Sequence, residues 1–477
     1  MLSPSAYRGM AGFHKYWGKK PVECLAYLVE RFSQPGELVV DPFMGSGLVA
    51  RETLELGRQF IGCDINPVAV QLATLLMFPP DSEELREAFE YVRSTCARAI
   101  GESYATADGE IASHYLWRDD EMVEVWRRIG TRRKVQMEPT SHDRRLAREF
   151  AAYQSRHLRP ISVFSNSRIN SNADLCLGDL FTGRALRNID LLLDSVRRFE
   201  DPVRRALLLS VTAASGQMSN MVFAITNRGK ALGKTESRTE VGSWVIGFWR
   251  PQLHFEISVW NCFESRLRKL LGALGRVNHV RADGCCSNVE AVVNGHHALA
   301  LTNNDALATL QSLPDGSAAL ILTDPPHSDR IPYLELSEIW NSILNAKCDF
   351  EREIVISNAR ERGKTRDAYA KAMQLVLRES ARVLKPDGVL TFLFNSRRAA
   401  DWRFLDDEFV NSIGLTPMGS FPMTYSAASV VQDNRDGALR EDRVLLYVKA
   451  SDATDKHRQG LDGIPGWSVS ARVGGSE

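Results

Sequence analysis

An acidic side chain, two prolines and a planar ring follow one another directly after an apolar run of the chain. The run is Ala318–Thr323, and the residues after it are Asp324, Pro325, Pro326 and His327. The run predicts a buried strand, and the prolines stiffen the turn and remove backbone donors, which leaves neighbouring carbonyls to accept hydrogen bonds. The carboxylate can accept a hydrogen from an amino group, and the ring can stack on a planar base. The tetrad therefore indicates chemistry on the exocyclic amino group of a nucleobase.

A second motif, far upstream, joins a short apolar run to a glycine-rich turn. Residues 39–47 read VVDPFMGSG, a helical pattern follows, and a second apolar run at 60–63 ends in Asp64. Strand, glycine turn, helix, strand and acid make the first βαβ unit of a doubly wound sheet. In such a unit the glycines let the backbone approach a ligand, and the acid can hold ribose hydroxyls. The turn lacks the G-x-G-x-x-G spacing of dinucleotide-binding folds, which disfavours NAD or a flavin.

The positions of the two motifs divide the chain into parts. Residues 1–80 form the N-terminal half of a catalytic domain, residues 81–290 an insertion, and residues 291–450 the C-terminal half of the domain. Residues 451–477 are polar and rich in Gly and Ser, and we expect them to be disordered. The sequence therefore predicts an α/β protein with a doubly wound, Rossmann-like sheet and a large, mostly helical insertion.

The pair of motifs resembles the S-adenosylmethionine-dependent, amino-directed DNA methyltransferases, which modify adenine N6 or cytosine N4. The sequence DPFMGSG at 41–47 looks like their cofactor loop, and TDPPH at 323–327 looks like their catalytic DPPY element. Residues 13–21 are similar to the segment that closes over the methionine end of the cofactor in that family. Residues 332–338 resemble a branch of large adenine-specific methylases, and residues 383–390 resemble the turn into a later strand of the sheet.

The resemblance implies a methyltransferase sheet, S-adenosyl-L-methionine as the cofactor, and double-stranded DNA as the partner; the residues themselves indicate no metal site. It assigns catalysis to Asp324, Pro325, Pro326 and His327. The carboxylate and the carbonyl of Pro325 would accept hydrogen bonds from the amine, and the ring of His327 would stack on a base flipped out of the duplex. It assigns cofactor binding to Asp41, Pro42, Phe43, Gly45, Ser46, Gly47, Asp64, Ile65 and Asp305. Of these, Asp64 would hold the ribose hydroxyls and Asp305 would contact the adenine ring.

Three residues just before the first helix have two interpretations each. Lys19 and Lys20 could meet the carboxylate of the cofactor, or they could be solvated charges. Trp17 could line the site or belong to the core, and a core position is favoured for so large an apolar ring.

The residue at 327 departs from the family pattern, which usually has Tyr, Phe or Trp there. The imidazole of His327 offers less stacking area and can titrate near neutral pH. Two alternatives to a DNA methyltransferase therefore stay open. One is a non-catalytic DNA-binding subunit of a modification or defence complex. The other is an RNA guanine-N2 methyltransferase, since those enzymes have a similar fold and tetrad. Within the favoured class, the leading Asp favours adenine N6 over cytosine N4.

The composition limits the classes of partner and compartment. No stretch of the 477 residues approaches the roughly 18 uninterrupted apolar residues of a membrane span, and no signal-peptide pattern is visible, so we expect a cytoplasmic protein with no membrane partner. The 8 cysteines include no C-x-x-C pair, which disfavours a zinc ribbon. The formal net charge is zero, but residues 113–283 hold 28 Lys and Arg against 18 Asp and Glu. This excess favours contact with a phosphate backbone. Subunits of a restriction or defence system are further candidate partners.

Overall fold

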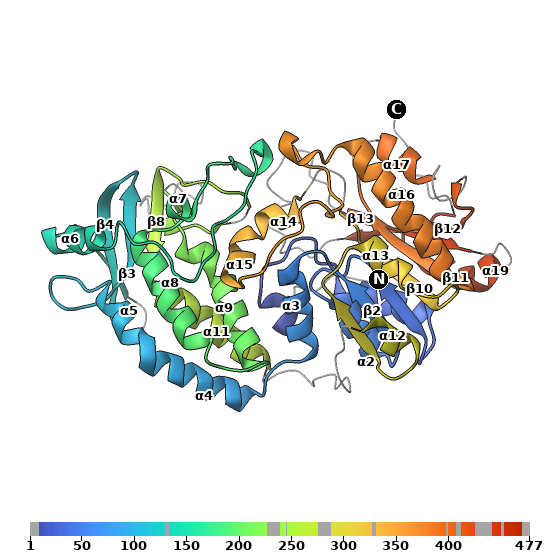
Figure 1. The fold of residues 1–477 in the computed structure, drawn as a ribbon, viewed down its shortest axis with the longest axis horizontal. Helices are drawn as coiled ribbons and strands as arrows, with labels where there is room; N and C mark the ends of the chain where they lie inside the picture. The colour runs from blue at the N-terminus through green and yellow to red at the C-terminus, as the bar shows by residue number, and fades with distance from the viewer. Residues whose placement is uncertain are drawn as a thin grey trace.

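The computed structural model describes residues 9–129, 133–226, 239–244, 246–274, 288–326, 331–396, 399–406, 412–424, 441–449 and 453–469. They form two lobes that lie side by side (Figure 1). His327 lies outside the described residues.

The lobe that carries both motifs is built on a seven-stranded sheet with the order β12-β13-β11-β10-β1-β2-β9. The strands from β9 to β11 are parallel, whereas β13 runs antiparallel to β11 and to β12. This is the doubly wound, Rossmann-like methyltransferase sheet that the sequence predicts. Its strands are β1 (Leu38–Asp41), β2 (Gln59–Cys63), β9 (Leu299–Thr302), β10 (Ala318–Thr323), β11 (Leu384–Phe394), β12 (Thr416–Thr424) and β13 (Glu441–Val448).

Both faces of this sheet are buried under helices. Val39 packs with α1 and α2, and the next residue, Val40, packs with α13 and α16 on the opposite face. Parallel strands covered on both sides read as near-continuous apolar runs, which is why β10 is visible in the sequence. The helices outside the insertion are α1 (Val22–Phe32), α2 (Leu48–Glu55), α3 (Pro67–Met77), α12 (Val289–Val293), α13 (Ala306–Gln311), α14 (Tyr333–Leu336), α15 (Glu338–Ile343), α16 (Arg366–Val383), α17 (Ala399–Asp406) and α19 (Ala453–Arg458).

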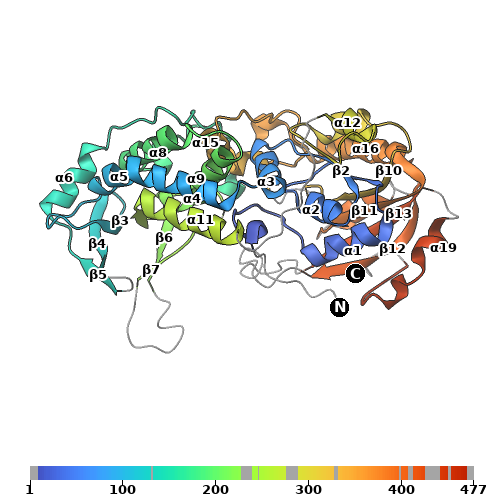
Figure 2. The same cartoon turned by 90° about the horizontal axis from the view of Figure 1, so that it is seen from below.

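The second lobe is the insertion between α3 and α12, and helices make up more of its described residues than strands do. The long helices α4, α9 and α11 pack against one another, as Figure 2 shows from below. Its helices are α4 (Ser82–Val92), α5 (Arg98–Glu102), α6 (Ser141–Glu149), α7 (Leu177–Leu180), α8 (Gly183–Val196), α9 (Val203–Met218) and α11 (Val259–Leu274).

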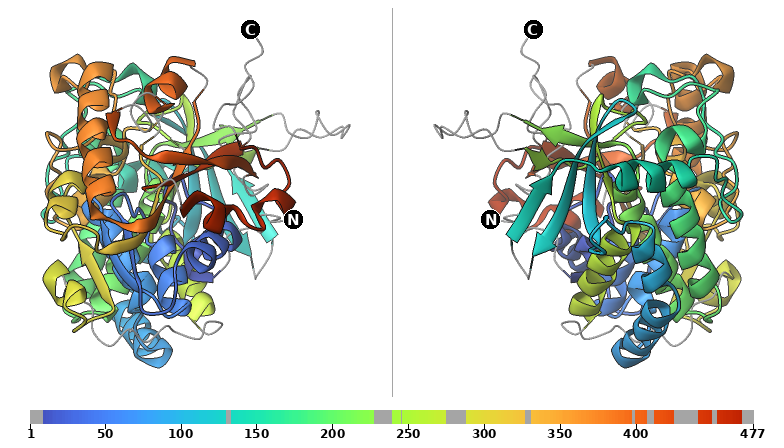
Figure 3. Two further views of the ribbon diagram at one scale, coloured as in Figure 1. Left: turned by 90° about the vertical axis from the view of Figure 1, so that its right-hand side faces the viewer. Right: turned by 90° about the vertical axis from the view of Figure 1, so that its left-hand side faces the viewer.

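The insertion also contains a six-stranded antiparallel sheet, with the order β5-β4-β3-β8-β6-β7, which the sequence did not predict. The strands β3 and β4 stand beside the helices in the right-hand view of Figure 3. Glu121, Glu124 and Arg127 interrupt the apolar pattern of β4, so its period of two is hidden. The strands are β3 (Ala112–Arg118), β4 (Glu121–Ile129), β5 (Arg133–Met137), β6 (Val222–Ile225), β7 (Glu240–Val241) and β8 (Leu253–Ile257).

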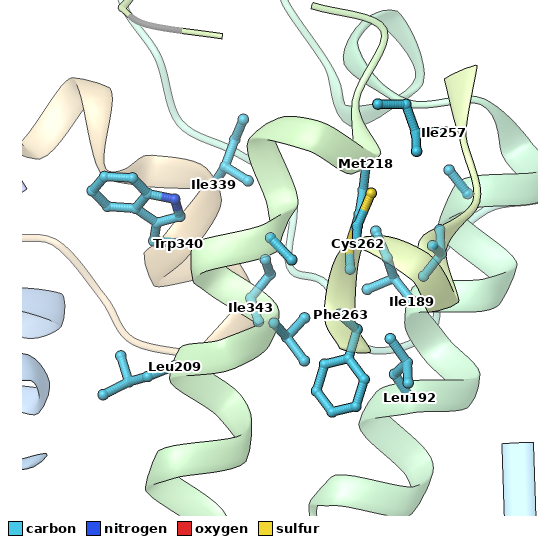
Figure 4. Packing of buried hydrophobic residues seen from close by; sticks show 14 of the residues in the cluster. Ile189, Leu192, Leu209, Met218, Ile257, Cys262, Phe263, Ile339, Trp340 and Ile343 are labelled. Atoms are coloured by element: carbon cyan, nitrogen blue, oxygen red, sulfur yellow. The ribbon is translucent and has the colours of Figure 1, made fainter. Parts of the chain in front are cut away.

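The two lobes share one hydrophobic core where α15 meets the insertion. Trp340 and Ile343 of α15 belong to the same buried cluster as Leu209 of α9 (Figure 4). An ion pair crosses the same junction, since Arg159 Nη1 lies 2.5 Å from Glu338 Oε1, whose side chain is fully buried. The insertion is therefore packed onto the segment that follows the tetrad.

Residues 453–469 are the described part of the C-terminal stretch 451–477, for which disorder was expected. In this part α19 begins at Ala453, and Leu461 is fully buried. Ser468 exchanges two backbone hydrogen bonds with Ser420 of β12, of 2.8 and 2.9 Å. Apolar residues such as Leu461, few in number, are enough to anchor this stretch on the sheet. Within the described part of the chain, no helix is both long and apolar enough to cross a membrane.

Candidate active site

A hollow opens at the carboxyl ends of the central strands. It encloses about 930 Å³, part of it open to solvent. It lies where β1 has β2 on one side and β10 on the other, which is the switch point of the sheet. Crevices of this kind are where doubly wound sheets bind ligands. Residues from both motifs line it: Asp41, Pro42, Phe43, Gly45, Ser46, Asp64, Ile65, Asp324 and Pro326.

The glycine-rich turn is held in shape by Asp41, the last residue of β1. Its Oδ1 accepts hydrogen bonds from the backbone N–H of Phe43 and from Oγ1 of Thr323, both at 3.0 Å. The bond to Thr323 joins the ends of β1 and β10, so the two motifs are in direct contact. Burial raises the pKa of Asp41 to about 8, against the lowering effect of these two hydrogen bonds.

Gly47 ends the turn in a conformation that only glycine adopts easily. Its φ is +81°, and a Cβ there would lie 2.7 Å from the Cβ of Ala73 in α3. Gly47 is therefore needed for the close approach of α2 and α3. It does not itself line the hollow.

Asp64 follows β2 and faces the glycine-rich turn. Its Oδ2 accepts the N–H of Gly45 at 2.9 Å, and its Oδ1 accepts the N–H of Asn66 at 2.8 Å. Removal of water by the surrounding protein raises the pKa of Asp64 to about 7. The ionised form of such a buried carboxylate is stabilised most by a ligand that donates hydrogen bonds or carries positive charge.

Asp324 follows β10 and is the acid of the tetrad. Its Oδ2 lies 2.5 Å from Nζ of Lys20, and one-fifth of its side chain is exposed. The turn after it is tied to α16, because the hydroxyl of Tyr369 donates a 2.7 Å hydrogen bond to the carbonyl of Pro326. Pro325 is buried and does not line the hollow.

Asp305 lies apart from the main hollow. Its Oδ1 caps α13 by accepting the N–H of Ala308 at 2.8 Å, and its Oδ2 lies 2.9 Å from Arg352 Nη1. It lines a neighbouring hollow of about 710 Å³, which shares Arg352, Glu353 and Ile354 with the main one. A role of Asp305 in contacting a ligand of the main hollow would require Arg352 to move.

The segment before α1 covers the hollow. Tyr16 stacks on Tyr333 with 6.1 Å between ring centroids. A Cβ added to Gly45 would lie 3.5 Å from the ring of Tyr16. Trp17 lines the hollow and stacks on Trp340 at 4.9 Å, with 7% of its surface exposed. Trp17 is thus part of the core and of the wall at once.

Lys19 is also turned inward rather than solvated. Its Nζ donates to the carbonyls of Ala11 at 2.7 Å and of His14 at 2.8 Å. Burial lowers the pKa of Lys19 to about 7.

The wall includes polar residues that were not predicted as site residues, among them Tyr16, Tyr333, Arg352 and Glu353. Tyr16 and Tyr333 lie in stretches that resemble family motifs, so their place near the site could have been inferred. Arg352 and Glu353 lie in a stretch without any motif. Glu353 Oε2 lies 2.6 Å from Nη2 of Arg362, and Arg362 Nη1 lies 2.6 Å from Oε1 of the buried Glu335. Only the folded chain brings these residues to the hollow.

The hollow is therefore lined by four carboxylates, by the basic side chains of Lys19, Lys20 and Arg352, and by aromatic rings. Its carboxylates are Asp41, Asp64, Asp324 and Glu353. The described residues contain no cluster of three His, Cys, Asp or Glu arranged to hold a metal ion. Such a hollow suits an organic ligand that has hydroxyl donors and a positive charge.

Comparisons with known proteins agree with the motifs. Residues 4–75 match the N6/N4 methyltransferase family, described as DNA methylase. The chain is 33% identical over 76 residues to the type II methyltransferase M.MjaII of Methanocaldococcus jannaschii, which is 16% of this chain and 14% of that protein. It is 41% identical over 58 residues to the type II methyltransferase M1.MboII of Moraxella bovis, which is 12% of this chain and 22% of that protein.

These matches confirm, for a part of the chain, the resemblance to the N6/N4 DNA methyltransferases. The chain spans less than a quarter of the length of each of these two relatives, at 14% and 22%. Among solved structures, the cytosine-N4-specific PvuII DNA methyltransferase matches 31% of this chain and 48% of its own, with 16% identity and a TM-score of 0.20. The fold assignment rests on the strand order of the sheet, since that TM-score is too low to support it.

Proposed function

We propose that this chain transfers a methyl group from S-adenosyl-L-methionine to the exocyclic amino group of a base in double-stranded DNA, most favourably to adenine N6. The observation that carries the proposal is the direct contact between the two motifs. Asp41 of the glycine-rich turn accepts a hydrogen bond from Thr323, and the next residue is Asp324. A ligand in the turn and a base beside the tetrad would therefore meet in one hollow.

The hollow fits this cofactor in its chemistry. Asp64 would hold the ribose hydroxyls, and Gly45 and Ser46 would pass close to the methionine part of the molecule. Burial raises the pKa values of Asp41 and Asp64 because it disfavours their charged forms. A cationic ligand with hydroxyl donors would stabilise those charged forms. Asp305 would contact the cofactor only after Arg352, with which it forms an ion pair, is displaced. When bound, S-adenosylmethionine supplies an electrophilic methyl group, so that a C–N bond forms, an S–C bond breaks and the amine loses a proton.

The tetrad would make the amine a better nucleophile. The lone pair of an exocyclic amine is delocalised into the ring, and hydrogen-bond acceptors on its two hydrogens favour a pyramidal nitrogen. The carboxylate of Asp324 and the carbonyl of Pro325 are proposed as these acceptors, and His327 as the ring that stacks on the base. The remaining contribution is positioning, for which Tyr369 fixes the turn at Pro326.

Double-stranded DNA is the proposed partner, and the insertion is the proposed contact region. Residues 113–283, which form most of the insertion, carry the basic excess of the chain. A target base inside a duplex cannot reach the hollow unless it is flipped out. The adenine preference comes from the leading Asp of the tetrad. The competing proposal is a non-catalytic, DNA-binding subunit whose partners are subunits of a restriction or defence system.

The test is transfer of labelled methyl from S-adenosylmethionine to unmethylated duplex DNA and to bulk tRNA, with the methylated nucleosides identified by mass spectrometry. N6-methyladenine in DNA is the expected product. The variant Asp324→Ala should lose transfer by about a hundredfold or more, as removal of a positioned polar group from a transition state does, and should still bind S-adenosylmethionine. Label in tRNA alone would favour an RNA methyltransferase. Wild-type turnover by Asp324→Ala would refute the site assignment.

A further inference from the structure

We infer that Lys20 is a positioning residue, which orients Asp324 for the transfer step. The inference rests on the proposed function and deepens it. Family resemblance offered Lys20 as a contact of the cofactor carboxylate. In the structure its Nζ lies instead 2.5 Å from Asp324 Oδ2. Only 6% of the Lys20 side chain is exposed, so water screens the pair weakly.

Oxygen atoms from different parts of the chain surround the ammonium group. Besides Asp324, Nζ contacts Oδ2 of Asp442 at 3.2 Å and donates to the carbonyl of Gly18 at 3.1 Å. Asp442 belongs to β13 and is fully buried. Lys20 itself directly precedes Pro21, which caps α1. The ammonium group is thus anchored by the sheet and by the start of a helix.

The segment that carries Lys20 is shaped to approach Asp324 closely. Gly18 has a φ of +79°, and a Cβ there would lie 3.0 Å from the hydroxyl of Tyr333 and 3.8 Å from Oδ2 of Asp324. The same segment places Tyr16 over Gly45 at the other end of the hollow. Residues 16–20 therefore span the hollow from the glycine-rich turn to the tetrad.

The surroundings of Asp324 are acidic. Asp41 on β1 and Asp442 on β13 interact with members of the Asp324–Lys20 pair, and Tyr333 on α14 presents a neutral hydroxyl. The ammonium group of Lys20, 2.5 Å from Asp324 Oδ2, brings a positive charge into these surroundings. An ionised carboxylate accepts a stronger hydrogen bond from an amine than its protonated form does. It can also take the proton that the nitrogen sheds.

The experiment separates this role from a structural one. Lys20→Met alone leaves the buried Asp442 without its cation, and the variant can fail to fold. Asp442→Asn removes that charge, so the comparison is between Asp442→Asn and the double variant Lys20→Met with Asp442→Asn. We expect the double variant to bind S-adenosylmethionine as Asp442→Asn does, within a factor of about three, measured by calorimetry. Its kcat should be at least about tenfold lower, so that kcat changes while binding of the cofactor does not.

The matched control is Lys385→Met. Lys385 forms an ion pair of 2.8 Å with Glu37, away from the hollow and with a third of its side chain exposed. This variant should transfer methyl groups as the wild type does. Equal kcat values for Asp442→Asn and the double variant would overturn the role of Lys20.

A second readout does not depend on transfer. In the Asp442→Asn background, Lys20→Met and Asp324→Asn should have non-additive effects on the urea midpoint, because the two side chains interact directly. Additive effects would overturn the pairing. Absence of transfer by the wild-type chain would refute the proposed function instead, so the two failures are distinguishable.

Discussion

Arg362 offers the sharpest test of how the wall of the hollow is held. Its guanidinium group is 1% exposed and forms ion pairs of 2.6 Å with Glu335 and with Glu353, whose side chains are 0% and 3% exposed. It also donates to the carbonyl of Phe350 at 3.0 Å. In Arg362→Met the side-chain volume is largely kept, but two buried carboxylates lose their cation. Loss of one partner from a buried ionic network costs about 3–5 kcal/mol, and we expect that decrease in the free energy of unfolding.

The assay is urea unfolding followed by circular dichroism and by tryptophan fluorescence at pH 5 and pH 8. Burial raises the pKa of Glu353, and Arg362 lowers it. Without Arg362 the pKa of Glu353 in the folded state rises further, so the folded variant binds more protons than the unfolded chain. The decrease in the free energy of unfolding caused by Arg362→Met should therefore be largest at pH 8 and shrink toward pH 5, where Glu353 can be neutral.

Two variants make the test specific. Adding Glu335→Gln and Glu353→Gln to Arg362→Met removes the uncompensated charges and should recover at least half of the lost stability. Arg98→Met removes an ion pair with Glu102 whose arginine side chain is 91% exposed, and should leave the free energy of unfolding unchanged within error. A loss below about 1 kcal/mol in Arg362→Met at pH 8, or a deficit that grows toward pH 5, would refute this account of the wall.

Two further predictions concern the glycine-rich turn and the acid opposite it. Gly47→Ala should destabilise the chain by about 1–3 kcal/mol more than Gly57→Ala in urea unfolding. Both glycines have positive φ (+81° and +76°), but only a Cβ at 47 meets a neighbour within 4 Å. Equal losses of stability in the two variants would contradict the clash. Affinity for S-adenosylmethionine, measured by calorimetry, should fall as the pH drops from 8 to 6, since the pKa of Asp64 is about 7 and the ionised form is the better acceptor. Asp64→Asn should bind about tenfold more weakly and remove most of this pH dependence, and a variant with unchanged affinity would exclude Asp64 from the cofactor contacts.

The positions of the two motifs in the fold were predictable because both depend on local pattern. The apolar runs before Asp41 and Asp324 are short, continuous and followed by turn residues, which is typical of central parallel strands. Parallel strands end at the same edge of a sheet, so two acids that directly follow such strands are expected to lie near one another. The hydrogen bond between Asp41 and Thr323 is the structural form of that expectation.

The partners of those acids were not predictable, because they depend on packing between segments far apart in the chain. The contact of Lys20 with Asp324 spans 304 positions, and that of Arg352 with Asp305 spans 47. In the sequence Lys20 is one of two adjacent lysines, and nothing there distinguishes it from a solvated charge. The sheet of the insertion was missed for a related reason, since the charges on β4 conceal which of its residues face the core.

The connection between the lobes bears on how DNA binding would reach the tetrad. The chain runs from Asp324 to α14 and α15 within twenty residues, and α15 is built into the core of the insertion through Trp340 and Ile343. Trp340 also stacks on Trp17, which stands next to the segment that holds Asp324 through Lys20. A packed core transmits displacement instead of absorbing it. We therefore expect a displacement of the insertion to be felt at Asp324 from both sides, through α15 and through Trp17.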